Sequence, residues 1–263
     1  MRILLTNDDG IHAEGLTALE EIARQLTDDI WICAPEYEQS GASRALTLAD
    51  PIRVRRLDER RFATTGTPTD CVMLAIDELV QGARPDLVLS GVNRGANLAE
   101  DVTMSGTVAG AIEAMAMGVP GIALSQAGWS SEPGGSQDTP MYEAAIHFAP
   151  GIIRKLVEAG WPGDVVMNLN FPRLPLEQIT EGEVTRQGFR DVAVRHAEKR
   201  TDLRGREYYW MGYRSERSQP ADGTDLKALY EGRISVTPLH IDLTHAPTIH
   251  ALKGVLGGAP PKS

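Results

Sequence analysis

The sequence predicts an α/β fold, in which a three-layer Rossmann-like core with a mostly parallel sheet carries a projecting C-terminal β-hairpin extension. Short apolar, β-branched runs alternate with amphipathic helical patterns through residues 1–180, as they do in βαβ units. Several of these runs end in polar loops that contain glycine. After residue 180 the pattern changes to strand-like segments separated by long charged stretches. We therefore expect a core over residues 1–180 and, within the same domain, an extension with a C-terminal return segment over residues 181–263.

Composition narrows the class of protein. The chain has 263 residues, of which 42% are hydrophobic and 24% charged, and these values are ordinary for a soluble globular domain. The formal net charge of −10 argues against binding to a nucleic-acid polymer, which needs a basic surface. Cys33 and Cys71 are too few for a disulfide framework and are expected to be small buried side chains. Because we see no signal-peptide pattern and no run of about 18 apolar residues, we expect a cytoplasmic protein without membrane association.

The first βαβ unit is predicted from the N-terminal apolar pattern. Residues 2–6 form a short run typical of a buried strand. Apolar residues then recur at helical spacing from Leu16 to Leu26, with charged residues between them. A second strand is expected over residues 30–34 and is ended by Pro35.

Two adjacent carboxylates, Asp8 and Asp9, follow the first predicted strand. Side chains alternate between faces along a strand, so neighbouring aspartates converge only where the pleat breaks into a turn, which Gly10 permits. Paired carboxylates that repel each other are the oxygen ligands that a hard cation prefers. The alternative is an Asx-rich turn with a helix cap, and at this point it stays open.

Two later loops follow the carboxyl ends of predicted strands. Residues 36–49 contain Ser40, whose hydroxyl could serve a cation or simply lie in a surface turn. A third core strand over residues 86–91 leads into a glycine-containing loop over residues 92–97, where Asn93 offers an amide oxygen. Because carboxyl ends of parallel strands meet at one edge of a sheet, we expect these side chains to lie near the aspartate pair.

A helix is predicted to begin at Ser105, Gly106 and Thr107 and to continue to Met117. Free backbone N–H groups and the positive end of the helix dipole make such a start an anion site. An ordinary N-cap by Ser105 has the same sequence, and the two interpretations are compatible.

The remaining elements follow from turn and periodicity signals. They are an edge hairpin over 52–56 and 61–63, a helix capped by Thr67 with Pro68 in its first turn and ended by Gly82, a strand over 121–125, a loop over 128–140, a helix over 142–159 kinked near Pro150, and a strand over 164–171.

The C-terminal region is predicted to hold strands over residues 184–187, 206–211 and 233–236. The charged stretch over 197–205 suggests a projecting β extension whose edges need a partner, which would bury Tyr208, Tyr209 and Trp210 in a subunit contact. A flexible surface excursion is the alternative. Residues 239–243 are expected to return to the core, and residues 257–263 to form a disordered tail.

Several stretches together resemble the SurE family of survival-protein acid phosphatases and nucleotidases. They are MRILLTNDDGIHAEGL at 1–16, SGAS at 40–43, GTPTDC at 66–71, SGVNRGAN at 90–97, SGTVAGA at 105–111 and VTPLHIDLT at 236–244. The resemblance covers nearly the whole chain in order. It implies one divalent cation per subunit, Mg²⁺ or Mn²⁺, held by Asp8, Asp9, Ser40 and Asn93.

The resemblance also implies phosphate contacts from Asn97, Ser105, Gly106 and Thr107. It implies hydrolysis of nucleoside 5′-monophosphates by metal-activated water, with 3′-monophosphates and polyphosphate as further substrates to test. Asp8 and Asp9 are the catalytic candidates. Family members are homodimers or homotetramers that exchange C-terminal segments, which agrees with an extension used in oligomerisation.

Two positions depart from the family pattern, and two other functions remain to be weighed. Glu14 stands where many relatives have proline, and Met104 stands where an aromatic residue or histidine is frequent. His12 could protonate a leaving group, although a solvent-facing position at the helix entry is the better interpretation. A serine acyl hydrolase using Ser40 or Ser105 lacks the G-x-S-x-G turn. A non-catalytic nucleotide-binding regulator lacks the G-x-G-x-x-G fingerprint after the first strand.

Overall fold

The computed structural model describes residues 1–128, 141–192, 195–213 and 218–256. Its centre is a nine-stranded sheet in the order β3-β4-β2-β1-β5-β6-β7-β11-β8. The inner strands β4, β2, β1, β5, β6 and β7 are parallel, whereas β3 pairs antiparallel with β4 and β11 pairs antiparallel with β7. The predicted mostly parallel α/β core is therefore confirmed.

The strands of this sheet carry the apolar runs of the sequence. Their bounds are β1 Ile3–Thr6, β2 Ile30–Pro35, β3 Val54–Asp58, β4 Arg61–Thr64, β5 Leu87–Arg94, β6 Gly121–Gln126, β7 Val166–Phe171, β8 Thr180–Val184 and β11 Arg233–Leu239. β1, β2, β6 and β7 are buried along their whole lengths, as expected of parallel strands that helices cover on both faces.

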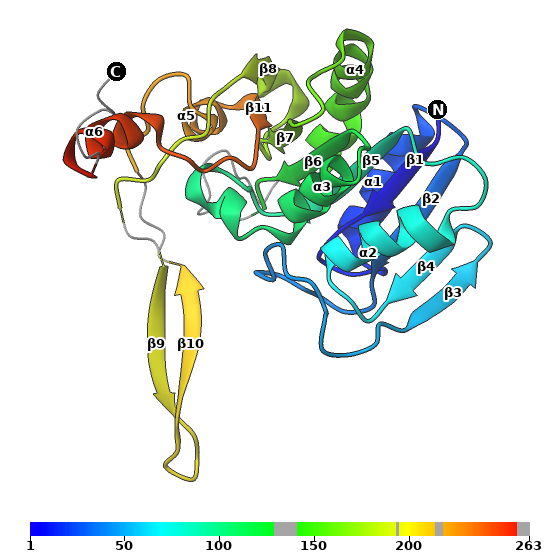
Figure 1. The fold of residues 1–263 in the computed structure, drawn as a ribbon, viewed down its shortest axis with the longest axis horizontal. Helices are drawn as coiled ribbons and strands as arrows, with labels where there is room; N and C mark the ends of the chain where they lie inside the picture. Colours follow the sequence, from blue (N-terminus) through cyan, green and yellow to red (C-terminus); the bar gives the residue numbers. More distant parts are fainter. Residues whose placement is uncertain (129–140, 193–194, 214–217, 257–263) are drawn as a thin grey trace, which may run out of the picture.

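Helices cover both faces of the sheet and complete three layers (Figure 1). On one face lie α1 Glu14–Arg24 and α4 Glu143–Ala159, which pack against each other and contribute to the largest apolar cluster. On the other lie α2 Pro68–Leu74, a π-helical turn Ala75–Leu79 and α3 Gly106–Ala116. Thr67 caps α2 through a reciprocal capping box with Asp70, as its position before Pro68 predicted.

Four elements differ from the sequence prediction. β5 continues through Asn93 and Arg94, which were expected in a loop, because these residues still pair with Ser125 and Gln126 of β6. β8 ends at Val184 rather than beginning there, although the backbone N–H of Thr185 still donates to the carbonyl of Val236 in β11 at 3.0 Å.

The other two differences concern a helix end and the C-terminal return. The helix expected to reach Gly82 ends at Leu79, where Val80 takes an extended conformation. Leu239 returns to the core as predicted, but Ile241 and Leu243 do not, because their side chains are 51% and 82% exposed.

Short helices that no sequence signal had predicted complete the fold. They are η2 Ala99–Thr103, η3 Leu176–Gln178, α5 Asp225–Tyr230 and α6 Ala246–Leu256. Cys33 and Cys71 are buried as free thiols, as expected. Pro150 lies inside α4, and a kink there stays a prediction. Most of the predicted 128–140 loop and the whole predicted tail fall outside the described residues.

The C-terminal extension is a two-stranded arm that projects from the body (Figure 1). β9 Arg195–Thr201 and β10 Glu207–Tyr213 pair only with each other, antiparallel, and form a sheet of their own. The predicted projecting β-hairpin is therefore present. Within the described ranges, no helix is long and apolar enough to cross a lipid bilayer.

Candidate active site

The turn after β1 is built by local hydrogen bonds that the sequence encodes. The Asn7 side-chain amide donates to the carbonyl of Gly10 at 2.9 Å, which closes the turn over Asp8 and Asp9. Gly10 has a φ of +105°, a conformation that residues with a Cβ rarely adopt. The N-cap of α1 is Ala13, without a side-chain hydrogen bond, so neither aspartate caps this helix. The helix-cap alternative for the pair is therefore excluded.

Asp8 lies against the N-terminus of α3. Its side chain is buried, and its Oδ1 accepts a 2.5 Å hydrogen bond from the hydroxyl of Thr107. A Cβ on Gly106 would lie 2.8 Å from the Cβ of Asp8, so only glycine allows this approach. Burial raises the pKa of Asp8, and the hydrogen bond from Thr107 partly opposes that shift. The start of α3 and Asp8 are thus held together by a hydrogen bond and by close packing.

Asp9 carries the least satisfied carboxylate of the site. Its Oδ2 is buried and has no hydrogen-bond partner in the structure. Burial and the charge of Asp8 raise the pKa of Asp9 to about 6, although a backbone hydrogen bond from Arg94 acts in the opposite direction. A buried carboxylate oxygen without a donor costs free energy unless a proton or a cation satisfies it. The donor set here, two carboxylates with neighbouring hydroxyl and amide oxygens, suits a hard divalent cation.

Ser40 and Asn93 lie next in the chain to residues that contact the aspartate pair. The backbone N–H of Gln39 donates to the carbonyl of Asp8 at 2.7 Å, which places the following residue, the exposed Ser40, beside the turn. Asn93 precedes Arg94, whose backbone N–H bonds the Asp9 carboxylate. The Asn93 amide nitrogen donates to the carbonyl of Gly95 at 2.9 Å, so its amide oxygen is the atom left to serve a ligand.

The start of α3 has the features of an anion site. The hydroxyl of Ser105 accepts the N–H of Val108 at 3.1 Å, which confirms Ser105 as the N-cap. The N–H groups of Gly106 and Thr107 belong to the first turn, where no intrahelical acceptor is available. Ser43 and Arg44 tie the 36–49 loop to this helix through Met104 and Glu113.

Asn97 is held firmly by side chains of β6 and β7. Its backbone N–H donates to Asn170 at 2.8 Å, and its carbonyl accepts from the amides of Asn168 and Asn170. Its side-chain nitrogen donates to the hydroxyl of Ser125 at 2.8 Å. The backbone and amide nitrogen of Asn97 are therefore fixed, and these contacts do not involve its side-chain oxygen.

Three further positions near the site in the sequence differ in their exposure to solvent. His12 is exposed, which agrees with a solvent-facing residue at the helix entry. Glu14 is the first residue of α1 and is also exposed. Met104 is half-buried directly before Ser105, where it lies beside the expected phosphate site.

Two further side chains belong to this region and were not predicted. Glu38 accepts the hydroxyl of Ser40 at 2.8 Å, and its charge contributes to the raised pKa of both Asp8 and Asp9. Burial and the charge of Asp9 raise the pKa of Tyr142 to about 12. Glu38 stood out only as one charge in a polar loop. Tyr142 reaches the site from α4, a position that chain order alone does not reveal.

The part of the chain that the structure describes contains no cluster of acidic, histidine and cysteine side chains that would form a second metal site. There, no three or more histidine, cysteine, aspartate or glutamate side chains gather in an arrangement that could hold a metal ion. Any cation at the carboxyl edge of the sheet would therefore depend on the aspartate pair completed by neutral oxygen ligands.

Comparisons with known proteins show the family of the chain. The family model described as "Survival protein SurE" matches residues 3–194. A protein named 5′-nucleotidase SurE from Phenylobacterium zucineum is 76% identical over 262 residues, covering 100% of both chains. One of the same name from Caulobacter vibrioides is 72% identical, covering 100% of this chain and 98% of the relative. The crystal structure of the SurE protein from Aquifex aeolicus matches with a TM-score of 0.81 and 36% identity, covering 97% of this chain and 100% of the other.

Proposed function

This chain belongs to the SurE family of survival proteins, and on that premise we propose that it is a divalent-metal-dependent 5′-nucleotidase. In this proposal it hydrolyses nucleoside 5′-monophosphates to nucleoside and phosphate at the site formed by Asp8, Asp9 and the start of α3. The names of its relatives support the reaction, because proteins 76% and 72% identical to it are called 5′-nucleotidases.

The observation that carries the proposal is the contact between a carboxylate pair and a helix N-terminus. Thr107 joins the two by donating to Asp8, while the Oδ2 atom of Asp9 is buried without a partner. A phosphate monoester needs both a cation and hydrogen-bond donors around its oxygens during hydrolysis. The arrangement supplies a place for each, because the hydrogen bond between Thr107 and Asp8 joins residues that are 99 positions apart in the chain.

The cation is assigned to Asp8, Asp9, Ser40 and Asn93, with one ion per subunit and Mg²⁺ or Mn²⁺ as its identity. When bound, such an ion supplies Lewis acidity toward a phosphoryl oxygen and toward water. The Ser40 hydroxyl donates a hydrogen bond to Glu38, which leaves the lone pairs of the hydroxyl oxygen available. The Asn93 amide nitrogen is held by Gly95, which fixes the direction of its oxygen.

The remaining residues bind and orient the phosphate. The N–H groups of Gly106 and Thr107 and the dipole of α3 stabilise negative charge on its oxygens, both in the substrate and as charge redistributes during the reaction. Asn97 and Ser105 are assigned to the same phosphate. One carboxylate of the pair takes the proton of the attacking water, through an oxygen that does not bind the cation, and either Asp8 or Asp9 can fill this role.

The two rival functions find little support in the geometry. A serine acyl hydrolase places its nucleophile in a G-x-S-x-G turn, which neither serine has: the Ser105 hydroxyl caps α3, and the exposed Ser40 hydroxyl donates to the exposed Glu38. A nucleotide-binding regulator without catalysis would not need the unpartnered carboxylate oxygen of Asp9 beside the anion site.

The test is phosphate release from a panel of nucleotides. The panel contains 5′- and 3′-monophosphates of each base and a polyphosphate, assayed with Mg²⁺, with Mn²⁺ and with excess chelator. We expect release from 5′-monophosphates that needs a divalent cation and stops with chelator. Undiminished release in chelator would contradict the metal-dependent mechanism, and nucleotide binding without any release would favour the regulator. The 3′-monophosphate and polyphosphate arms decide two narrower predictions of substrate range.

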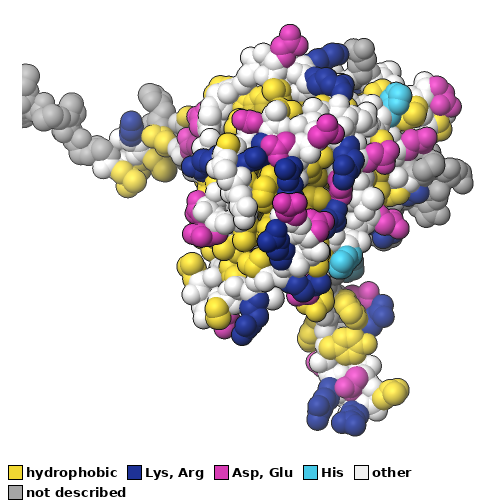
Figure 2. Space-filling model, turned by 90° about the vertical axis from the view of Figure 1, so that its right-hand side faces the viewer, with side chains coloured by type: hydrophobic (Ala, Val, Ile, Leu, Met, Phe, Trp, Pro, Cys, Tyr) yellow, Lys and Arg dark blue, Asp and Glu magenta, His cyan; other side chains and the backbone are white. Residues whose placement is uncertain are grey.

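We also propose that the arm and the C-terminal helix serve self-association, in a homodimer or homotetramer with exchanged C-terminal segments. On the arm, Tyr209 and Trp210 are 57% and 59% exposed, and hydrophobic side chains cover much of it (Figure 2). On α6, Ile249, Leu252 and Val255 are exposed at helical spacing. Light scattering of the purified chain tests this proposal, and a monomer at micromolar concentration would contradict it.

A further inference from the structure

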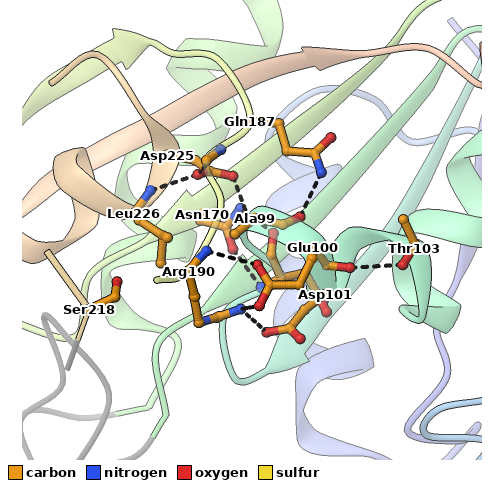
Figure 3. A network of polar contacts seen from close by, with 12 residues as sticks. Ala99, Glu100, Asp101, Thr103, Asn170, Gln187, Arg190, Ser218, Asp225 and Leu226 are labelled. Carbon is orange, nitrogen blue, oxygen red and sulfur yellow. Dashed lines mark hydrogen bonds and ion pairs between the residues drawn. The ribbon is translucent and has the colours of Figure 1, made fainter. Parts of the chain in front are cut away.

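The arm is anchored to the body by segments on both of its sides, and both segments contact η2. Residues 187–190 precede β9, and Asp225 begins α5 after β10. Figure 3 shows Gln187, Arg190 and Asp225 gathered around Ala99, Glu100 and Asp101 of η2. η2 lies in the chain between Asn97 and Ser105, two of the residues assigned to phosphate. The base of the arm therefore adjoins the backbone that carries the phosphate site.

Arg190 binds both acidic side chains of η2. Its guanidinium lies 2.7 Å from the carboxylate of Asp101 and 3.2 Å from that of Glu100, and its backbone N–H donates to Glu100 at 3.2 Å. The Arg190 side chain is only 14% exposed, so it is well shielded from competing solvent. Without this cation, two neighbouring half-buried carboxylates would face each other unpaired.

Asp225 and Gln187 hold the backbone of the same short helix. The Asp225 carboxylate accepts the N–H groups of Ala99, Gly188 and Leu226 at 2.8, 2.8 and 2.7 Å. The Gln187 amide donates to the carbonyl of Ala99 at 3.0 Å. Ala99 has a φ of +53°, which is unfavourable for a residue with a Cβ and needs such support.

Asp101 transmits this anchoring to the start of α3. While its carboxylate binds Arg190, its backbone carbonyl accepts the N–H of Met104 at 2.9 Å and that of Ser105 at 3.1 Å. The same residue thus contacts the arm base through its side chain and the phosphate-binding turn through its main chain. A shift of Asp101 would displace Ser105 and the N–H groups that follow it.

We propose that Arg190 is a positioning residue for phosphate binding, which acts through Asp101 to hold Ser105 and the first turn of α3 in place. This inference rests on the proposed function, because it takes the start of α3 as the phosphate site. Arg190 does not contact the aspartate pair in any hydrogen bond or ion pair that the structure describes, so its loss should affect phosphate and spare the cation.

The experiment measures direct binding by titration calorimetry of the full chain. Inorganic phosphate is titrated in the presence of Mn²⁺, and Mn²⁺ is titrated alone, for wild type, Arg190→Gln, Arg190→Lys and Asp101→Asn. We expect Arg190→Gln and Asp101→Asn each to weaken phosphate binding about tenfold, as losses of orienting contacts commonly do, with Arg190→Lys intermediate. Mn²⁺ affinity should stay within about twofold of wild type in all of them.

A double variant and a matched arginine complete the design. Because Arg190 acts through Asp101, the Arg190→Gln/Asp101→Asn double variant should bind phosphate no more weakly than either single variant. Arg233→Gln removes another arginine that pairs with two carboxylates, Glu183 and Glu231, outside residues 97–107, and it should leave phosphate affinity within about twofold of wild type.

Three results would overturn the inference. They are wild-type phosphate affinity in Arg190→Gln, an equal loss of Mn²⁺ affinity, or additive losses in the double variant. If wild type itself neither binds phosphate nor releases it from AMP, the proposed function fails together with the inference. If wild type does both and Arg190→Gln is unchanged, only the positioning role fails.

Discussion

Two pairs of adjacent aspartates flank neighbouring parallel strands, and their environments are opposite. Asp28 and Asp29 precede β2 at the amino edge of the sheet, whereas Asp8 and Asp9 follow β1 at the carboxyl edge. The first pair lies among arginines on the surface. The second is enclosed by the start of α3 and the loop after β2.

The ionisation of the two pairs shows what each environment does. Burial acts to raise the pKa of Asp29, but ion pairs with Arg2 and Arg60 outweigh it and lower that pKa. In Asp9, burial and the charge of Asp8 together raise the pKa to about 6. Arg2 and Arg60 therefore dominate the environment of Asp29, whereas burial dominates that of Asp9.

The comparison teaches that the Asp-Asp dipeptide alone does not identify a site. Its position relative to strand direction does, because ligands of open α/β sheets bind beyond the carboxyl ends of the strands. At that edge, the loop after β2 and the N-terminus of α3 both contact Asp8. At the amino edge, the residues that arrive are arginines.

The largest expected effect separates the two pairs directly. Asp9→Asn should lower phosphate release about 1,000-fold, because it removes a carboxylate from the centre of the site. Its stability without metal should be unchanged or higher, since a buried unpaired charge has been removed. Phosphate-release rates and urea unfolding of the metal-free protein measure the two effects.

Asp29→Asn is the matched control for that variant. It should retain full activity and lose less than about 1 kcal/mol of stability, because its ion pairs are partly exposed to solvent. Equal activity losses in the two variants would show that the two edges of the sheet do not differ in function.

The second largest effect concerns stability. It contrasts Asp9 with Asp225, a buried carboxylate whose oxygens accept hydrogen bonds from the protein backbone. Asp225→Ala leaves three N–H groups, those of Ala99, Gly188 and Leu226, without their acceptor. We expect a loss of about 3 kcal/mol in the free energy of unfolding, measured with urea. Asp222→Ala, at a side chain 97% exposed, should leave stability nearly unchanged. A stable Asp225→Ala protein would mean that this carboxylate, like that of Asp9, is not needed for folding.

The predictable part of the molecule is the part with local signals. The caps at Thr67 and Ser105 and the carboxylate turn after β1 each depend on residues within a few positions of one another. Strand direction then placed Asp8, Ser40 and Asn93 at one edge of the sheet. A residue whose role depends on a distant partner had no such signal, as Arg190 and Tyr142 show.

The wrong element boundaries have a similar cause. Asn93 was expected in a loop because of its neighbouring glycines, but pairing with β6 keeps it in the strand. Leu243 was expected in the core because it is apolar, yet it is 82% exposed. The exposure of Leu243 depends on how the residues after β11 pack, and the hydrophobic pattern of the sequence does not reveal that packing.

A smaller effect tests the close approach of α3 to the aspartate pair. A methyl group at Gly106 would lie 2.8 Å from the Cβ of Asp8, so Gly106→Ala must displace Asp8 or the helix. We expect about a tenfold fall in activity and a stability loss of about 1–2 kcal/mol from overpacking. Gly151→Ala, in the exposed interior of α4 with no atom within 4 Å, should be neutral or stabilising. Normal activity in Gly106→Ala would show that the close approach of α3 to Asp8 is not needed for activity.

The smallest effect concerns pH and the amino-edge pair. Because the pKa of Asp29 is lowered from 3.8 in the folded protein, its contribution to stability is present above pH 3.8 and is lost as the pH falls further. The stability difference between wild type and Asp29→Asn should therefore be visible at pH 7 and disappear below pH 3.8. Urea unfolding across this range measures it, and a difference that grows with acidification would contradict the assigned ion pairs.

The most direct test of the central claim, that Asp8 and Asp9 form the anionic half of a cation site, is calorimetric titration of Mn²⁺ into the metal-free protein. We predict one site per subunit in wild type and in Asp29→Asn. Asp9→Asn should bind at least about 100-fold more weakly. Equal Mn²⁺ affinity in Asp9→Asn and wild type, or no saturable site in wild type, would contradict the claim.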